Sequence, residues 1–465
     1  MKIIYKNIDF ETNKNIDINS IDLRDEFDDI LKDIPKNLEF YLSWISEKNT
    51  LRCDLYLDFL RVNLIKQYND IVVYTNRVGI YKEFQNNVSF INKIKFEIKF
   101  LKEKTIAFLS ILKFLSKYKI RKKRDMKDYI LIQTWVNKNN FKNGFKDNYF
   151  GNLYDVLKQK HKVLNWVIPF RDKLPKLDKK MFIEMNEGVG VIDYFRVIKL
   201  FFKKKKIDYK NKLFNYYRDI EKINYTDLCY FFAKNLKPKK VILLNENMVY
   251  QKAVILAGIK TIGYFHTTKP RNILCLEDFS LRSDIVLFNS YVYKNYFKLK
   301  NSFNTIAFKQ LYLKDNIKIN DYILVLLSGK KEEAIFLLKL LDKLNIKNIV
   351  FRQHPLNRFD ISKYYKNSYK LENNKPLTKI IGKKVISNYS AVAVEIATKG
   401  VFVGLVYDKN KLLLNPFDDT TLDNYMLISN IDELKEFIQK DTIITKTKQI
   451  FNIQQSCEKF LEVIK

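Results

Sequence analysis

The sequence predicts an α/β protein with two parallel-sheet domains and a large, basic, mostly helical portion in its first half. Three observations predict this class. About 225 C-terminal residues alternate short β-branched runs with helical segments, which is typical of parallel strands joined by helices. The length of 465 residues exceeds what one core normally organises, so two domains are expected. Hydrophobic residues make up 47% of the chain and aromatic residues 14%, which is enough for both cores.

The alternation of strands and helices is less regular in the first 240 residues than in the rest of the chain. Three apolar runs indicate strands of an N-terminal sheet, at 2–5, 40–45 and 71–75. The stretch of about 91–235 is rich in Lys and aromatic residues and poor in Gly and Pro. It is therefore expected to be a helical insertion into the first domain.

Two series of strands and helices follow. The first comprises strands at 241–245, 261–265, 284–288 and 304–308, with a helix at 247–258 closed by Gly258. After a polar stretch at 312–320, the second comprises strands at 322–327, 348–351, 384–387, 401–406 and 426–428, with a helix at 332–344. The expected domains are therefore 1–318 and 319–446, and a C-terminal helix at 447–465 is expected to pack back on the first domain.

The charge of the chain points to an anionic partner. Lys and Arg number 84 against 52 Asp and Glu, a net charge of +32. Such an excess favours nucleic acid, anionic lipid or a phosphorylated substrate, although an AT-rich coding sequence also inflates Lys. The four cysteines lie far apart with no CxxC or Cys/His spacing, so no metal site or disulfide framework is predicted. No signal peptide and no apolar run of membrane-spanning length is found.

The strongest candidate site residue is His354, one of only three histidines. The predicted strand at 348–351 ends just before it, and Pro355 restricts the backbone after it. In an open parallel sheet, ligands bind outside the carboxyl ends of the strands. His354, with Arg352 beside it, is therefore expected to donate a hydrogen bond to an anion at a strand tip; a histidine that only caps a loop is the alternative.

Two neighbouring strand tips carry polar residues suited to phosphate: Ser387, Asn388 and Ser390 after one strand, and Ser328, Gly329 and Lys330 after the other. The alternative for each serine is a simple helix cap. Together the three tips predict a pocket for a phosphate-bearing ligand, most simply a nucleotide. Glu395, further along the helix after Ser390, could reach ribose hydroxyls, and a solvated helix residue is the alternative. No GxxxxGK[ST] pattern occurs, so ATP hydrolysis is not supported.

The first domain is expected to face this pocket with its own strand tips. Glu246 follows the strand at 241–245 and is a candidate general base, or else a charge at a helix start. His266 and Thr267 follow the strand at 261–265 and are expected to contact acceptor or donor. A second acidic candidate is Glu187. It precedes two glycines that mark a turn or a close backbone approach.

Three segments together resemble a known family: "RQHP", "SNYSAVAVEIATKG" and "LNENMVYQKAVILAGIKTIGYFHT". They resemble bacterial glycosyltransferases of the two-Rossmann (GT-B) architecture that build surface polysaccharides such as capsule and lipopolysaccharide. Within these, the match is to His-Pro enzymes that use CMP-activated acidic sugars, the sialyltransferases and Kdo transferases. The resemblance covers roughly residues 240–420 and implies two Rossmann-like domains.

The resemblance also implies roles. By match, His354 assists the departing CMP phosphate, and Ser387 and Ser390 hold it. The family's base is often in an acidic motif before a glycine; the nearest string here is Asn186-Glu187-Gly188, so Glu187 and Glu246 both stay open.

The implied reaction is an inverting, metal-independent transfer, without cofactor, to a glycan or lipid-linked acceptor. The leaving phosphate can be stabilised by Arg352, His354 and a helix start without metal, and no apolar strand ends in a DxD triplet. His-Pro motifs also occur in teichoic-acid polymerases, so a CDP-polyol phosphotransferase, or a transferase of another nucleotide sugar, is the alternative. A nucleic-acid-binding protein is the alternative outside enzymes, although no nucleic-acid motif appears.

Two basic segments, 92–124 and 194–214, mix Lys and Arg with Phe, Ile and Leu at helical spacing. They are expected to lie against an anionic bilayer, the alternative being core-facing helices with a solvated Lys face. The protein is accordingly expected to be cytoplasmic and peripheral on the inner face of the bacterial cytoplasmic membrane.

Overall fold

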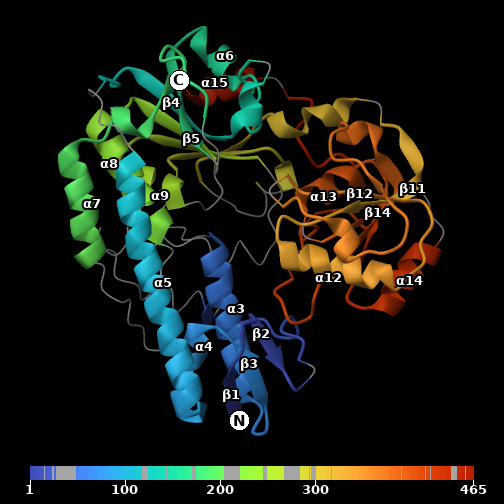
Figure 1. The fold of residues 1–465 in the computed structure, drawn as a ribbon. Helices are drawn as coiled ribbons and strands as arrows, with labels where there is room; N and C mark the ends of the chain where they lie inside the picture. The colour runs from blue at the N-terminus through green and yellow to red at the C-terminus, as the bar shows by residue number, and fades with distance from the viewer. Residues whose placement is uncertain are drawn as a thin grey trace.

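The structure is a computed structural model. It describes the chain except for residues 15, 24–25, 28–48, 118–123, 143, 170–173, 204–219, 245–248, 267–282, 293, 295–299, 316, 356, 389, 414, 419, 441–447, 456 and 465. The expected strand at 40–45 lies outside the described residues. The described strands form two parallel sheets in separate lobes and a third, small sheet near the N-terminus (Figure 1).

The larger sheet has seven strands in the order β10-β9-β8-β7-β4-β5-β6, and all its pairs are parallel. Its strands are β4 (Tyr129–Val136), β5 (Lys162–Pro169), β6 (Phe182–Ile183), β7 (Lys240–Leu244), β8 (Thr261–Phe265), β9 (Ile285–Phe288) and β10 (Ser302–Asn304). Successive side chains of a strand point to opposite faces. Leu131 thus joins the core under α8 (Ile220–Leu236) and α9 (Val249–Leu256), whereas Ile130 joins the core under α6 (Leu153–Lys158).

The second sheet has six strands in the order β13-β12-β11-β14-β15-β16, again all parallel. They are β11 (Ile319–Leu326), β12 (Ile349–Arg352), β13 (Lys370–Leu371), β14 (Ile381–Ser387), β15 (Phe402–Val406) and β16 (Tyr425–Ile428). Val325 and Ile323 face the core with α12 (Lys331–Asp342) and α14 (Ile431–Gln439), and Leu324 faces the core with α13 (Ala391–Ala397). The predicted α/β class with two parallel-sheet domains is therefore confirmed.

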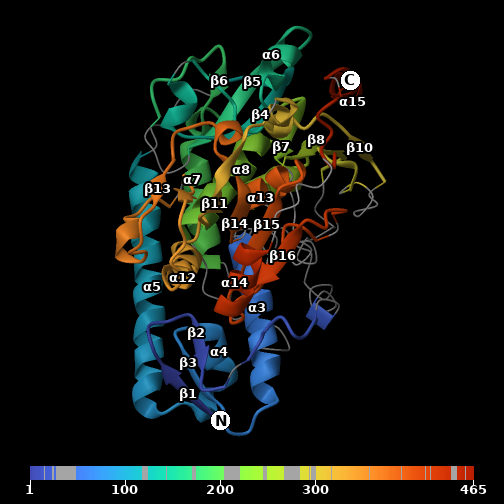
Figure 2. The same ribbon diagram turned by 90° about the vertical axis from the view of Figure 1, so that its right-hand side faces the viewer.

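The N-terminal module is the part built on the small sheet. Strands β1 (Lys2–Tyr5), β3 (Val72–Thr75) and β2 (Phe10–Thr12) lie in the order β1-β3-β2, with β1 parallel and β2 antiparallel to β3. Three helices belong to this part of the chain, α3 (Asn49–Lys66), α4 (Val78–Glu83) and α5 (Phe90–Lys117). Both ribbon views show α5 running from this module up to the lobe of the larger sheet, where it packs on α8 (Figures 1 and 2).

Two sequence predictions of elements are wrong. The stretch 91–235 is not a helical insertion, because, besides α7 (Val191–Lys203), it contributes β4 and β5, two eight-residue strands that lie between β7 and β6 in the larger sheet. The expected strand at 304–308 is also replaced: β10 ends at Asn304, and a 3₁₀ helix, η4, begins at Phe308. The described 3₁₀ helices are η1 (Gln85–Asn87), η2 (Lys138–Phe141), η3 (Met185–Glu187), η4 (Phe308–Lys314), η5 (Ile361–Lys363) and η6 (Leu377–Lys379).

The C-terminal segment returns to the larger sheet. Phe451 forms an isolated bridge with Ser290, and α15 (Glu458–Ile464) is shorter than the helix expected at 447–465. Ile464 lies in the core that holds α6, and the buried Lys240 Nζ donates to its carbonyl. Lys384 does the same for α14, since its Nζ donates to the carbonyls of Phe437, Ile438 and Lys440. Each buried ammonium thus satisfies carbonyls that a helix end leaves open.

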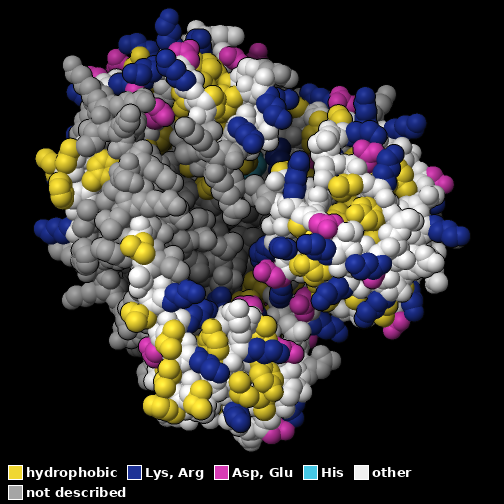
Figure 3. All heavy atoms as spheres, in the orientation of Figure 1, with side chains coloured by type: hydrophobic (Ala, Val, Ile, Leu, Met, Phe, Trp, Pro, Cys, Tyr) yellow, Lys and Arg dark blue, Asp and Glu magenta, His cyan; other side chains and the backbone are white. Residues whose placement is uncertain are grey.

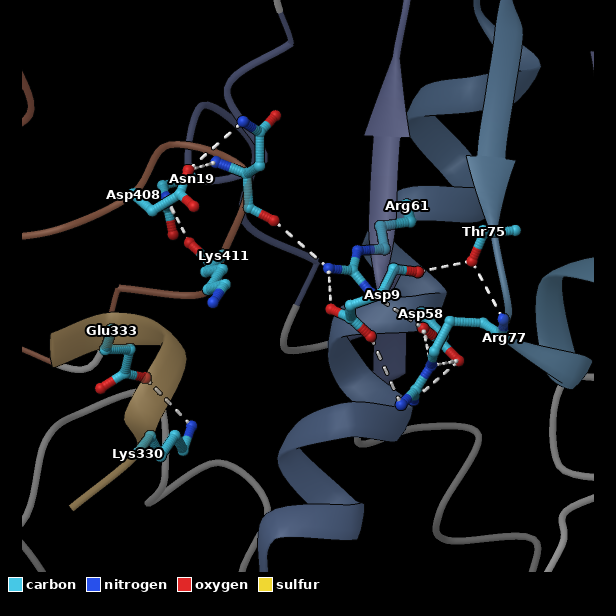
Figure 4. A network of polar contacts seen from close by, with 11 residues as sticks. Asp9, Asn19, Asp58, Arg61, Thr75, Arg77, Lys330, Glu333, Asp408 and Lys411 are labelled. Carbon is cyan, nitrogen blue, oxygen red and sulfur yellow. Dashed lines mark hydrogen bonds and ion pairs between the residues drawn. The ribbon is translucent and has the colours of Figure 1, made fainter. Parts of the chain in front are cut away.

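A buried ion network holds the N-terminal module together (Figure 4). Arg61, 1% exposed, donates to Asp9 over 2.8 Å and lies 3.4 Å from Asp58, which Arg77 also contacts through two nitrogens. Burial alone would raise the pKa of Asp9, but the positive charges of Arg61 and Arg77 hold it below its ordinary value. Arg61 also donates to the carbonyl of Asn410, so the network joins the module to the second sheet's domain.

A second set of hydrogen bonds reinforces that junction. Asn19 Nδ2 donates to Lys411 O, and its Oδ1 accepts from Leu413 N, while Ile18 N donates to Lys409 O. The N-terminal module therefore lies against the loop that follows β15. None of the helices in the described part of the chain is both long and apolar enough to cross a bilayer.

Replacing Arg61 tests the network. We expect Arg61→Met to lower the free energy of unfolding by about 3–5 kcal/mol, because two carboxylates lose their buried partner. The matched control is Lys162→Met, since the Lys162–Asp128 pair, with both side chains exposed, is worth at most about 1 kcal/mol. Denaturant titration followed by circular dichroism measures both, and equal losses would contradict the assigned role.

Candidate functional site

The predicted site lies at the carboxyl ends of three neighbouring strands of the second sheet. β11 pairs with β12 on one side and with β14 on the other, so their ends meet at one edge. His354 lies two residues beyond the end of β12 and is half-buried. Its ring rests on Gly329, three residues after β11 ends at Leu326, and an added Cβ there would lie 3.2 Å from Nδ1. Gly329 thus leaves the space that the imidazole occupies.

A lysine that the sequence did not single out completes this edge. The positive charge of Lys309, in η4, acts on the imidazole of His354. Burial, and then this positive charge, lowers the pKa of His354 below its ordinary value. The imidazole of His354 in the free protein therefore gives up its proton more readily than an ordinary histidine does. An anion bound there would be attracted by Lys309 and would favour protonation of His354.

The serines of the strand tips divide into two groups. Ser390 is the N-cap of α13, yet its hydroxyl makes no capping hydrogen bond, and the residue is only half-buried. Its hydroxyl therefore remains available to a ligand.

Ser387 and Ser328, in contrast, are occupied internally. The Ser387 hydroxyl is fully buried and donates to Leu326 O, while that of Ser328 donates to Glu333 and accepts from Lys330 N. Their expected contact with phosphate stays a prediction, and it would require these hydrogen bonds to be exchanged.

Three further candidate residues of this edge, Arg352, Lys330 and Asn388, interact with other parts of the protein. Arg352 donates from Nη1 to Lys375 O over 2.7 Å, and the exposed Lys330 ammonium lies 3.3 Å from Glu333. Asn388 is 3% exposed and donates to Val406 O, but its Oδ1 has no hydrogen-bond partner within the described structure. An unsatisfied buried acceptor is costly, and this one lines a small pocket with Glu333 and Asp408.

Glu395 does not lie where the sequence predicted. It is 1% exposed rather than solvated, and its carboxylate accepts hydrogen bonds from Gln310 Nε2 and from the Tyr312 hydroxyl. Both oxygens are therefore engaged within the protein, and the ribose-binding expectation is corrected. Gln310 also donates to His266 O over 3.0 Å. The cluster ties α13 of the second sheet, through η4, to the end of β8 in the larger sheet.

The edge of the larger sheet presents a histidine beside a buried carboxylate. His266 follows β8, is 3% exposed, and lies edge-on to Tyr149 with ring centroids 4.8 Å apart. Asp147 accepts from the backbone N–H groups of Tyr149 and Phe150. Burial raises the pKa of Asp147, although those hydrogen bonds, Thr134 and the charge of His266 oppose the shift. The two titratable groups therefore influence one another at this edge.

The sequence predicted two acidic residues, Glu187 and Glu246, as candidate general bases. Glu187 is 3% exposed; its Oε2 accepts from Glu184 N, and its Oε1 lies 3.6 Å from Arg124. This carboxylate stabilises a turn, and its role as a general base stays a prediction. The close approach predicted at Gly188 is confirmed, since an added Cβ would lie 2.5 Å from Phe232. Glu246 and Thr267 lie outside the described residues.

Sequence analysis missed Lys309, Gln310 and Asp147. Each owes its place to a contact with a residue far away in the chain, and none belongs to a recognisable motif. The only local pattern near Lys309 and Gln310 was the short apolar run at 304–308, which predicted a strand and no site. Across the described residues, no group of three or more His, Cys, Asp or Glu side chains is arranged to hold a metal ion.

Comparison with known proteins gives matches only among solved structures, because no family model and no curated protein matches the sequence. The wall teichoic acid polymerase TagF is 13% identical over 81% of this chain and 92% of that chain, with a TM-score of 0.37. UDP-GlcNAc 2-epimerase from Neisseria meningitidis, bound to UDP-GlcNAc, is 10% identical over 72% and 99%, with a TM-score of 0.37. The glycosyltransferase of kitacinnamycin is 8% identical over 68% and 90%, with a TM-score of 0.36. Similarities at this level assign no activity to the chain.

The buried carboxylate of Asp147 gives a pH-dependent prediction. A raised pKa in the folded state means that the stabilising contribution of this group is present below pH 3.8 and is lost as pH rises through the folded-state pKa. We expect Asp147→Asn to increase Tm relative to wild type, and to do so more at pH 8 than at pH 4. Thermal unfolding across that range measures the difference. A gain that is constant with pH would contradict a buried charge at this position.

Proposed function

We propose that the protein is an inverting, metal-independent glycosyltransferase. It would move an acidic sugar of the sialic acid or Kdo type from a CMP donor to a surface glycan or glycolipid acceptor. The observation that carries the proposal is the position of His354, held over Gly329 and beside Lys309 where β12, β11 and β14 end. An imidazole, an ammonium and the Ser390 hydroxyl suit the phosphate of a departing nucleotide.

The chemistry follows from these groups. In a CMP-activated sugar, the bond that breaks joins the anomeric carbon to a phosphate oxygen, and CMP leaves with the electron pair. Lys309 would compensate the charge that develops on this phosphate, and His354 would donate a hydrogen bond or a proton to it. Attack by the acceptor hydroxyl from the opposite side inverts the anomeric carbon.

The acceptor hydroxyl must lose its proton to a base. Among the described candidates, His266 suits this role better than Glu187, because Glu187 is occupied by Arg124 and Glu184. Asp147 beside His266 would stabilise the imidazolium that forms, as a buried carboxylate does in other His-dependent enzymes. Glu246 remains the alternative base.

A CDP-polyol phosphotransferase is the second candidate. Its donor also releases CMP, but the attacked atom is the β-phosphorus instead of an anomeric carbon. The Lys309 ammonium favours this alternative as well, because a second phosphate can use a second cation. For nucleic-acid binding, the remaining alternative, no feature of this edge offers specific support.

A ligand and donor screen tests the proposal. We expect CMP to raise Tm more than UDP, GDP or dTDP at equal concentration, because a ligand that binds only the folded state stabilises it. Hydrolysis of CMP-sialic acid or CMP-Kdo supports the acidic-sugar donor, and hydrolysis of CDP-glycerol supports the alternative. Stabilisation by none of these nucleotides, with binding to a defined RNA instead, would refute both.

Replacement of His354 tests its part in the reaction. We expect His354→Ala to reduce turnover about 10²- to 10⁴-fold, since it removes a proton or hydrogen-bond donor from the leaving group, while circular dichroism stays unchanged. The control is His161→Ala, because His161 precedes β5, which begins at Lys162, at the end of the larger sheet away from this edge. Equal turnover in wild type and His354→Ala would eliminate the assignment.

The charge of Lys309 can be tested without activity. The chain has three histidines, so NMR titration resolves their pKa values individually. Because a positive neighbour disfavours the imidazolium, Lys309→Met should raise the pKa of His354 in the free protein. CMP should raise it in wild type and raise it less in the variant. If CMP leaves this pKa unchanged, the phosphate is bound elsewhere.

A further inference from the structure

We infer that α5 and the start of α7 form a docking face for an anionic lipid bilayer. The face is defined by nine exposed apolar residues: Phe90, Ile91, Ile94, Ile98, Leu101 and Leu109 of α5, and Val191, Ile192 and Phe195 of α7. Their exposed fractions run from 44% to 76%. Large apolar side chains scattered singly on a surface are normal, but a stripe of six along one side of a helix indicates an interaction site.

The α5 residues of the docking face share one side of the helix. Their spacing of three and four residues keeps them within about a third of the helix circumference. Phe96, on the opposite side, is fully buried, where it stacks on Tyr81 at 4.6 Å and meets Tyr5 edge-on at 5.0 Å. The core of the N-terminal module therefore already anchors α5, and the exposed stripe is not a second core contact.

The three α7 residues repeat the arrangement. Val191, Ile192 and Phe195 lie on one side of the first helical turns, and the exposed Lys199 follows one turn later. Figure 3 shows apolar side chains over the lower part of α5 and over α7 on the same side of the molecule. A flat, extended partner can reach both helices at once.

The charged residues beside the stripe indicate which kind of partner binds it. Lys95 and Lys102 are exposed along one margin of the α5 stripe. On the other lie Lys93 and the exposed Glu97, which accepts a hydrogen bond from the Tyr81 hydroxyl, so the net charge beside the stripe is positive. This combination of apolar centre and basic margins fits acyl chains and anionic head groups, because lysine stems can bury while their ammonium groups reach the phosphates. A second copy of α5 fits less well, since pairing two such helices would bring lysines of both copies together.

The inference goes beyond the proposed reaction. It states where a lipid-bound acceptor would meet the protein, but the docking itself requires no turnover. The face lies on helices of the N-terminal half, whereas the donor edge lies in the second sheet. Lipid binding and donor chemistry can therefore be separated by experiment.

Vesicle co-sedimentation tests the inference on the full chain. Vesicles of equimolar phosphatidylglycerol and phosphatidylcholine are compared with vesicles of phosphatidylcholine alone. We expect binding to the anionic vesicles that weakens with salt, and a loss of at least tenfold in Ile98→Glu/Leu101→Glu. Lys95→Ala/Lys102→Ala should weaken it about fivefold for each lysine. The control, Leu371→Glu, alters an exposed apolar residue on β13, 46% exposed, and should bind as wild type does.

Three results would overturn the inference: no binding of wild type to anionic vesicles, equal binding of wild type and Ile98→Glu/Leu101→Glu, or a change of oligomeric state in that variant with vesicle binding retained. Both glutamates replace side chains more than 60% exposed, so the fold should persist, which circular dichroism verifies. Donor hydrolysis without vesicles should equal that of wild type, so failure of docking is distinguishable from failure of the proposed function.

Discussion

The buried carboxylate of Glu395 is the contact on which the relation between the two sheets depends. A buried charge is tolerated only when its oxygens are hydrogen-bonded, and here Gln310 and Tyr312, both from η4, supply the donors. Because Gln310 also holds the carbonyl of His266, the same short helix fixes the end of β8 against α13. The positive charge of the neighbouring residue, Lys309, acts on the imidazole of His354. One 3₁₀ helix thus brings both sheet edges to one place.

The two edges differ in their electrostatics, and that difference suits a transfer reaction. Around His354, burial and Lys309 disfavour a proton, so this edge is poised to receive negative charge. Around His266, burial raises the pKa of the Asp147 carboxyl and a positive charge on the imidazole opposes that shift, so this edge suits a developing positive charge. A leaving phosphate and a deprotonating hydroxyl make these opposite demands. Buried groups with perturbed pKa values at facing edges are typical of functional sites.

The sequence predicted the second sheet well because its strands are short, β-branched and separated by regular helices. It failed at β4 and β5, where Gln133, Thr134 and Asn165 interrupt the apolar pattern although all three are buried. Within the site, His354 was predictable because Pro355 and a strand end fix it locally. The spacing of the motif could not reveal that the Ser387 hydroxyl donates to Leu326 O of the neighbouring strand. Lys309 and Asp147 depend on tertiary contacts that no local pattern encodes.

The lysines that contribute to the net charge of +32 have different roles in different parts of the molecule. Lys240 and Lys384 are buried and cap helix ends, so they contribute to the fold and not to a partner surface. Lys309 is half-buried and acts on one imidazole. Lys95 and Lys102 border an apolar stripe, where charge and apolar area act together on a lipid surface. The net charge of the whole chain therefore cannot identify the partner, because the burial and the neighbours of each lysine determine its role.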